Sequence, residues 1–300
     1  MRLLIVGASG FLGTHVRGQA AAAGIEVMTA GRSAGADLPG YHHLDLAEDD
    51  PARIAAALAE VAPDAVVNCA GATAGDPGTL AAANVSATFA LVKAMLVTQL
   101  PARLVHLGSA AEYGSTEPGV PVSERTGPRP AGEYGLTKLA GTRLVELGIT
   151  AGLDGVTLRV FNPVGPGAPQ TSLPGRLVAE LRRALEQGTD VRLGSLDAVR
   201  DFVDARDVAD AVLAAAAAPV RPHPVLNIGS GQGTPVRALV KELLAISGYT
   251  GAVHEDALGL PRPQDVPWQQ ADISRAQEDL GWAPRRDLGT SLNDLWEASR

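Results

Sequence analysis

The chain has little of what several protein classes require. Cys69 is its only cysteine, so an intrachain disulfide or a cysteine metal cluster is not possible. Aromatic residues make up 4% of the 300 residues, which argues against a stacking surface for bases, and the net charge is -8. An acidic chain without a Lys/Arg cluster is atypical of nucleic-acid or anionic membrane binding. We therefore expect a small molecule as the binding partner and no nucleic acid.

Long apolar runs are lacking as well. The apolar run that begins at Met1 is interrupted by Gly7 and is too short for a signal peptide. The stretch 211–220 falls well short of the about 20 apolar residues that a membrane-spanning helix needs. The six histidines show no metal-ligand spacing, and we expect no metal. These absences predict a cytoplasmic protein without membrane contact.

Strand-like and helix-like runs alternate through the first half of the chain, and 46% apolar residues are ample for a core. This alternation predicts the α/β class, with a doubly wound parallel sheet covered by helices on both faces. Strands are expected at 3–6, 26–29, 43–46, 65–68, 104–107, 156–160 and 225–228. Helices are expected from 11 and 52 and at 79–100, 134–150, 174–187 and 272–280.

The local amino-acid composition changes after residue 162, where proline and glycine become frequent. We predict a dinucleotide-binding domain of residues 1–162 and 200–230. A smaller, discontinuous substrate-binding lobe is predicted for residues 163–199 and 231–300.

A glycine-rich turn, Gly7-Ala-Ser-Gly-Phe-Leu-Gly13, connects the first predicted strand to the first helix. Glycines there permit a tight turn and let backbone amides approach a pyrophosphate at the start of a helix. The alternative is an ordinary strand-to-helix turn without a ligand. The position of the glycine-rich turn after the first strand favours dinucleotide binding. The predicted cofactor contacts in this turn are Gly7, Ser9, Gly10, Phe11 and Leu12.

An acidic residue that would hold an adenosine ribose is expected about 20 residues after the turn. Arg32 follows the second strand instead, and a guanidinium can accept a 2'-phosphate, so we expect NADP, with NAD as the alternative. Arg32 can also be a solvated loop residue. Asp45 and Leu46 suit the adenine edge, although a role for Asp45 in capping the next turn is almost as plausible. Ala70 and Gly71 leave space for a cofactor after the fourth strand.

Tyr134 and Lys138 are four residues apart on a predicted helix, so their side chains lie on one face. An ammonium beside a phenol favours phenolate and lowers the phenol pKa from about 10 toward working pH. Ser109 follows a buried strand whose carboxyl end would present its hydroxyl to the same crevice. The three residues predict proton transfer to or from a carbonyl group. A surface pair on a helix is the alternative for Tyr134 and Lys138.

Over nearly its whole length the chain resembles the extended short-chain dehydrogenase/reductase family of nucleotide-sugar epimerases, dehydratases and reductases. The matching segments are residues 7–13, 68–71, 108–114, 134–138, 159–165, 200–207, 227–231 and 280–284. The resemblance implies a Rossmann fold and a homodimer formed through the helices at 79–100 and 134–150.

The resemblance also implies roles for single residues. Tyr134 is the catalytic acid/base, Lys138 binds the nicotinamide ribose and lowers the Tyr134 pKa, and Ser109 hydrogen-bonds the reacting oxygen. Further cofactor contacts fall on Tyr134, Lys138 and Phe161. Asn162, Arg200 and Arg262 match substrate-binding positions, where two arginines suit a diphosphate. Arg200 can instead form a structural ion pair with Asp201 or Asp204.

Ala110 and Ala111 follow Ser109 where the dehydratases of the family carry an Asp-Glu pair, so dehydration lacks its proton carriers. Arg32 favours a reductase over an epimerase that retains NAD. The chain looks most like reductases of GDP-4-keto-6-deoxymannose, which implies NADPH-dependent reduction of a ketone, C4 of an NDP-4-keto-6-deoxyhexose. The alternatives are a UDP-hexose 4-epimerase, a ketoreductase of a non-sugar natural product, and a non-catalytic NADP sensor.

Overall fold

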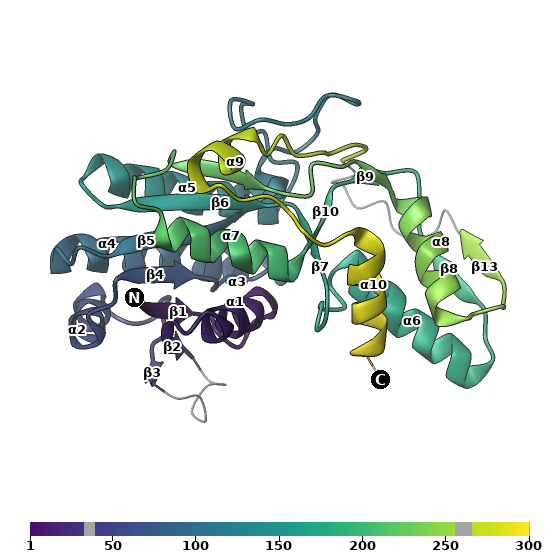
Figure 1. Cartoon of the computed structure of the whole chain (residues 1–300), viewed down its shortest axis with the longest axis horizontal. Helices are drawn as coiled ribbons and strands as arrows, with labels where there is room; N and C mark the ends of the chain where they lie inside the picture. Colours follow the sequence, from purple (N-terminus) through teal and green to yellow (C-terminus); the bar gives the residue numbers. More distant parts are fainter. Residues whose placement is uncertain (33–39, 256–265, 300) are drawn as a thin grey trace.

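A seven-stranded parallel sheet forms the larger part of the protein (Figure 1). The computed structural model describes residues 1–32, 40–255 and 266–299. The strand order is β11-β6-β5-β4-β1-β2-β3, so the chain reverses its direction of winding between β1 and β4. The strands are β1 (Arg2–Val6), β2 (Glu26–Gly31), β3 (Tyr41–His43), β4 (Ala65–Asn68), β5 (Arg103–Ser109), β6 (Gly155–Val160) and β11 (Val225–Ile228). The predicted Rossmann-like α/β fold is confirmed.

Helices cover both faces of this sheet because its central strands are buried on both sides. In β1, Leu3 and Ile5 pack under α1 and α7, whereas Leu4 and Val6 pack under α2 and α4 on the opposite face. The helices are α1 (Phe11–Ala22), α2 (Pro51–Val61), α3 (Pro77–Ala81), α4 (Ala87–Thr98), α5 (Glu133–Thr150) and α7 (Ala205–Ala217).

The sequence places most strands within two residues of their observed positions, and β3 is the exception. It spans Tyr41–His43, not 43–46, because the chain turns at Asp45. The Asp45 Oδ1 accepts the Ala47 N–H at 3.1 Å, and the Asp45 carbonyl accepts the Asp49 N–H at 2.7 Å. A turn closed in this way cannot continue as a strand.

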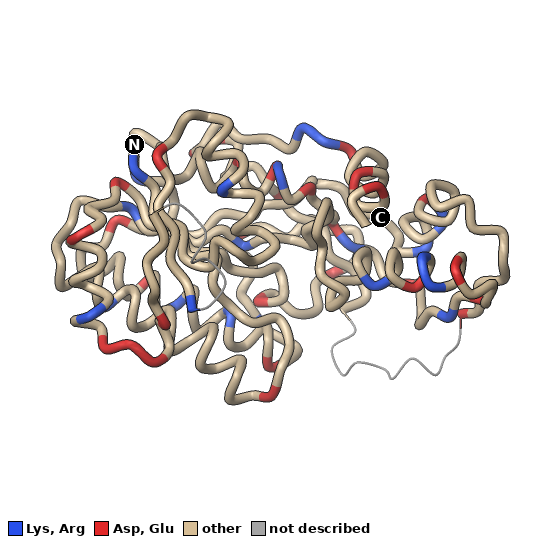
Figure 2. The backbone as a smooth tube through the Cα atoms, turned by 90° about the horizontal axis from the view of Figure 1, so that it is seen from below, with Lys and Arg blue, Asp and Glu red and all other residues tan. Residues whose placement is uncertain are grey.

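One continuous helical stretch, Pro77–Thr98, contains a π-helical turn at Ala82–Ser86 between α3 and α4. It is long and apolar enough to cross a membrane by length and composition alone, and half of its most apolar part is buried inside the protein. Such burial is typical of a core helix. Figure 2 shows acidic and basic residues interspersed over both parts of the described chain.

A smaller lobe lies beside the carboxyl ends of the large sheet's strands and has its own apolar core (Figure 1). Leu177 and Leu181 of α6 pack with Leu239 of α8 and Trp296 of α10. Its elements are α6 (Leu173–Gln187), β8 (Val191–Leu193), α8 (Val236–Ser247), β13 (Val253–Glu255) and α10 (Leu288–Glu297). Short pairs join it to the larger part: β7 (Asn162–Val164) with β10 (Phe202–Asp204), and β9 (Val199–Arg200) with β12 (Thr234–Pro235).

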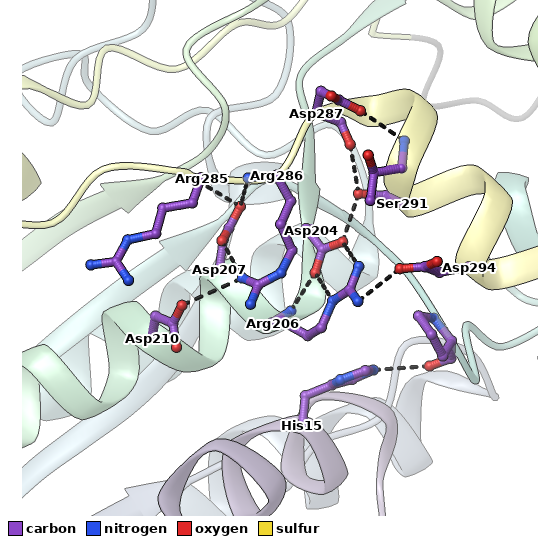
Figure 3. A network of polar contacts seen from close by, with 12 residues as sticks. His15, Asp204, Arg206, Asp207, Asp210, Arg285, Arg286, Asp287, Ser291 and Asp294 are labelled. Carbon is purple, nitrogen blue, oxygen red and sulfur yellow. Dashed lines mark hydrogen bonds and ion pairs between the residues drawn. The ribbon is translucent and has the colours of Figure 1, made fainter. Parts of the chain in front are cut away.

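The predicted domain boundaries stay a prediction, but the segment 266–286 lies largely against the larger part. Ala276 of α9 (Ser274–Leu280) and Trp282 belong to the core between the sheet and α7. A polar network then fastens α10 to α7 (Figure 3). Arg206 donates to Asp204 at 2.9 Å and pairs with Asp294 at 2.8 Å, and Ser291 donates to Asp204 at 2.6 Å.

Candidate active site

The turn between β1 and α1 has no room for side chains at two of its glycines. Gly7 has a φ of +78°, and a Cβ there would lie 2.7 Å from the Ala70 nitrogen. A Cβ on Gly13 would lie 2.1 Å from the Gly7 carbonyl oxygen. The Gly7 N–H donates to the Ala30 carbonyl at 2.9 Å, which holds the turn against β2. The close approach of backbone that the glycine spacing predicts is therefore present.

Helix α1 begins at this turn with Gly10 as its N-cap, and no side chain caps its first turn. Ser9 and Gly10 are exposed, whereas Phe11 and Leu12 are half-buried. Backbone amides at an uncapped helix start, together with the helix dipole, form a site for an anion. The cradle fits the pyrophosphate of a dinucleotide, with Gly7, Gly10 and the first residues of α1 as its holders.

Arg32 is exposed one residue beyond the end of β2. It stands at the edge of the sheet where β1 ends in the glycine turn, which suits contact with an adenosine ribose. Asp45 is engaged in the turn after β3, as its alternative reading predicted, and Leu46 is buried. Of these three residues, Arg32 has the side chain most accessible to a bound dinucleotide.

Ala70 and Gly71 follow β4 and lie between the glycine turn and α5. The Ala70 N–H donates to the Asn68 Oδ1 at 3.1 Å. A Cβ added to Gly71 would lie 2.8 Å from the Asn84 Oδ1 and 3.8 Å from the Lys138 Nζ. The small residues predicted to leave space for a cofactor thus lie beside the predicted catalytic lysine.

Ser109 and Tyr134 come together although 25 positions separate them in the sequence. Ser109 ends β5 and Tyr134 lies in the first turn of α5, where the Ser109 hydroxyl is close enough to lower the Tyr134 pKa. Lys138 lies one turn further along α5, where its Nζ donates to the Leu107 carbonyl at 2.5 Å. The three predicted catalytic residues therefore lie at the carboxyl end of β5.

Protonation of this group differs from the prediction. Burial raises the pKa of Tyr134, the nearby Ser109 hydroxyl lowers it, and the charge of Glu112 raises it further. We expected the Lys138 ammonium to lower the Tyr134 pKa; in the structure, removal of the phenol from water outweighs any such effect. Burial also lowers the pKa of Lys138, against the charges of Glu112 and Cys69. The tyrosine is thus a phenol at neutral pH and can donate a proton.

Asn84 was not predicted as a site residue. It lies in the π-helical turn, and its Nδ2 donates to the Ala72 carbonyl at 2.9 Å and to the Thr137 Oγ1 at 3.0 Å. Thr137 in turn donates to the Tyr134 carbonyl at 2.9 Å. Asn84 therefore fixes the start of α5. Its only signal in the sequence is a polar residue inside an apolar helix, and π-helical turns are frequent at functional sites.

Two of the predicted substrate residues, Asn162 and Arg200, lie on the strand pairs that join the two parts. The Asn162 Nδ2 donates to the Asp201 carbonyl at 2.8 Å, and the Arg200 Nη1 donates to the Val199 carbonyl at 2.9 Å. Arg262 lies outside the described residues. The carboxylates considered as partners of Arg200 have other contacts: Asp201 accepts the Ser230 and Ala271 N–H groups, and Asp204 pairs with Arg206.

Phe161, predicted as a cofactor contact, has a fully buried side chain that packs beside Tyr113. Its ring fills the small core cluster behind the Ser109 turn. Only its backbone is therefore placed to meet a bound molecule. Among the described residues, no three His, Cys, Asp or Glu side chains form a group that could hold a metal ion.

Comparisons with known proteins agree with this geometry. The chain is 39% identical over 307 aligned residues to dTDP-6-deoxy-L-talose 4-dehydrogenase (NAD(P)(+)) of Kitasatospora kifunensis, covering 99% of this chain and 95% of that protein. It superimposes on the structure of RMD from Pseudomonas aeruginosa complexed with NADPH with a TM-score of 0.83 at 27% identity, covering 99% and 98% of the two chains. MoeE5 in complex with UDP-glucose and NAD gives a TM-score of 0.84 at 28% identity over 100% and 99%.

Residues 3–229 match the sequence profile of the NAD dependent epimerase/dehydratase family. The match spans the glycine turn, Ser109, Tyr134 and Lys138. With these residues converging as described, the chain belongs to the NAD dependent epimerase/dehydratase family and is an NAD(P)-dependent enzyme of the extended short-chain dehydrogenase/reductase type.

Proposed function

We propose that the protein reduces the C4 ketone of an NDP-4-keto-6-deoxyhexose with NADPH. The relative from Kitasatospora kifunensis is named a 4-dehydrogenase of a dTDP-6-deoxyhexose, and reduction of the 4-ketone is the reverse of that reaction. The Pseudomonas aeruginosa RMD structure contains NADPH. The first name supports chemistry at C4 of a nucleotide-linked 6-deoxyhexose, and the second supports NADPH as the coenzyme.

The convergence of Ser109, Tyr134 and Lys138 at the carboxyl end of β5 is the observation that carries this proposal. A bound nicotinamide coenzyme would supply a hydride, while Tyr134 donates its proton to the substrate oxygen and the Ser109 hydroxyl orients that oxygen. Because burial raises the pKa of Tyr134, the side chain rests in the protonated form that ketone reduction requires. Ser109, Tyr134 and Lys138 remain our proposed catalytic residues.

The turn that follows Ser109 lacks the groups needed to eliminate water from a sugar. Ala110 and Ala111 carry no titratable group, and the next residue, Glu112, is fully buried. Both Glu112 oxygens accept hydrogen bonds, from Ser109, Thr142 and Arg159. Glu112 therefore cannot serve as the extra acid or base that a dehydratase needs.

NADPH consumption with a panel of ketones tests the proposed function. The panel contains dTDP-, GDP- and UDP-linked 4-keto-6-deoxyhexoses and non-sugar carbonyl compounds, each assayed with NADPH and with NADH. We expect oxidation of NADPH with at least one nucleotide-linked ketosugar. A protein purified with tightly retained NAD that interconverts UDP-hexoses would be a 4-epimerase. Turnover of non-sugar ketones alone would make it a natural-product ketoreductase, and absence of all turnover would leave the non-catalytic sensor.

Arg32 is our proposed determinant of NADP over NAD. Arg32→Ala is expected to raise the KM for NADPH about 10- to 100-fold, because charge-assisted hydrogen bonds to a 2'-phosphate are lost. NADH lacks this phosphate and serves as the matched control ligand, so its KM should change little. Steady-state kinetics with both coenzymes make the comparison. Equal changes in both KM values would show that Arg32 does not read the phosphate.

Homodimer formation and a cytoplasmic location stay predictions. Exposed apolar side chains on the two helices of the expected contact support the dimer, with Phe89 53% exposed on α4 and Leu147 67% exposed on α5. Leu136 of α5 is also exposed. Apolar side chains gathered on neighbouring helices are typical of protein–protein contacts.

A further inference from the structure

Glu112 is a buried carboxylate directly behind the Ser109–Tyr134 pair. It is 0% exposed, and its Oε1 accepts the Ser109 N–H at 2.9 Å. Its Oε2 accepts the Arg159 Nε at 2.7 Å, and the Thr142 hydroxyl donates to the same carboxylate at 2.9 Å. A Cβ added to Gly108 would lie 2.6 Å from the Glu112 Oε1, so only glycine at position 108 leaves room for this carboxylate. The carboxylate is thus fixed by β5, β6 and α5 together.

Arg159, the ion-pair partner of Glu112, lies on β6 and also contacts Tyr113. Its guanidinium lies 4.7 Å from the centre of the Tyr113 ring, and the Tyr113 hydroxyl donates to the Asn227 Oδ1 at 2.7 Å. The negative charge of Glu112 nevertheless acts on α5, because it raises the pKa of both Tyr134 and Lys138.

Stability alone gives no reason for this ion pair. Exchange of a buried ion pair for apolar side chains of similar volume is often neutral or stabilising, because two charges must lose their water. Ala110 and Ala111 precede Glu112, and Phe161 packs in the same small cluster, so apolar residues already fill this region. A charge kept in such surroundings points to a role in the adjacent site.

We propose that Glu112 is a positioning residue that fixes the Ser109 backbone and holds Tyr134 in its protonated form, the form that ketone reduction requires. The link between Glu112 and ketone reduction rests on the proposed function. The effect of the Glu112 charge on Tyr134 is independent of that function. Other titratable groups near the pair are few: Cys69 and the buried His106 lie close enough to Lys138 for their pKa values to respond to its charge. Glu112 is the one carboxylate among the causes that shift the Tyr134 pKa.

Glu112→Gln tests the proposal, since glutamine keeps the shape and the carbonyl oxygen but loses the charge. The chain has four tyrosines, so the ultraviolet absorbance of tyrosinate can be followed with pH, and subtraction of the Tyr134→Phe curve isolates Tyr134. We expect the Tyr134 midpoint to fall by about 0.5 pH units or more in Glu112→Gln. The alkaline limb of the kcat profile for ketone reduction should move down by the same amount.

Two further variants guard against a folding artefact. Glu112→Gln leaves Arg159 without its ion pair, so the double variant with Arg159→Gln removes both charges. Its Tyr134 midpoint should also fall, by less than in Glu112→Gln. Glu124→Gln is the matched control, because Glu124 is another buried carboxylate, 2% exposed and paired with Arg275 at 3.6 Å. It should leave the Tyr134 midpoint unchanged.

The possible outcomes separate the inference from the proposed function. An unchanged Tyr134 titration in both Glu112 variants would overturn the inference and leave a purely structural ion pair. An equal shift in Glu124→Gln would overturn it as well, because the effect would then be general. A shift confined to the Glu112 variants, in a protein that reduces no ketone on the panel, would support the charge effect and reject the proposed function.

Discussion

Tyr134→Phe is expected to bind NADPH normally and to lose about 10²- to 10⁴-fold in kcat, the usual contribution of a positioned general acid. The phenylalanine ring fills the same space at the start of α5, so the cradle at Gly7 and Gly10 stays intact. Only the Tyr134 hydroxyl is removed. Fluorescence titration with NADPH and steady-state kinetics on the best ketone of the panel measure the two effects separately.

Tyr249→Phe is the control for this loss. The Tyr249 hydroxyl donates to the Thr189 carbonyl at 2.9 Å in the smaller lobe, so its removal deletes a phenol oxygen away from the site. Its kcat should stay close to that of the unaltered protein. A Tyr134→Phe variant with near-normal turnover would reject Tyr134 as the proton donor.

The pH dependence has a defined sign. Burial raises the pKa of Tyr134, and a proton donor acts in its protonated form. Reduction should therefore be insensitive to this group through neutral pH and fall only on the alkaline side. A tyrosine governed by the Lys138 ammonium, as the sequence alone suggests, would lose its proton nearer to neutral pH.

Much of the site was predictable because parallel strands bring their carboxyl ends to one edge of a sheet. Strand ends at Gly7 and Ser109 can be read from local apolar runs, and the helical spacing of Tyr134 and Lys138 requires no tertiary information. Strands at 65–68 and 225–228 were predicted to the residue. Local periodicity was sufficient wherever an element is buried and regular.

Long-range polar contacts lay beyond such reasoning. Glu112 and Arg159 are 47 residues apart, and each taken alone reads as an ordinary charged residue in a loop or a strand. No local pattern indicates that they meet with water excluded. The sign of the Tyr134 pKa shift was missed for the same reason, since it depends on burial, which only the packed structure defines.

The return of the C-terminal segment to the larger part depends on another buried carboxylate that the sequence left unnoticed (Figure 3). Asp207 of α7 is 0% exposed, and its Oδ2 accepts the Arg285 and Arg286 N–H groups at 3.0 and 2.9 Å. Its Oδ1 accepts the Arg286 Nη1 at 2.5 Å, and its carbonyl accepts the Trp282 Nε1 at 2.9 Å. One residue, through its carboxylate and its carbonyl, therefore anchors the segment between α9 and α10.

Asp207→Ala is expected to lower the free energy of unfolding by about 3–5 kcal/mol, because it leaves two backbone amides without their acceptor and Arg286 with only its longer contact to Asp210. Asp210→Ala, one turn further along α7, is the matched control. Asp210 contacts the same Arg286 at 3.4 Å but is 27% exposed, so water can replace it and the loss should stay below about 1 kcal/mol. Urea unfolding of both variants gives the comparison. Equal losses would mean that burial of the Asp207 carboxylate contributes nothing beyond its charge, and the anchor would then have to be sought in the packing of Trp282 alone.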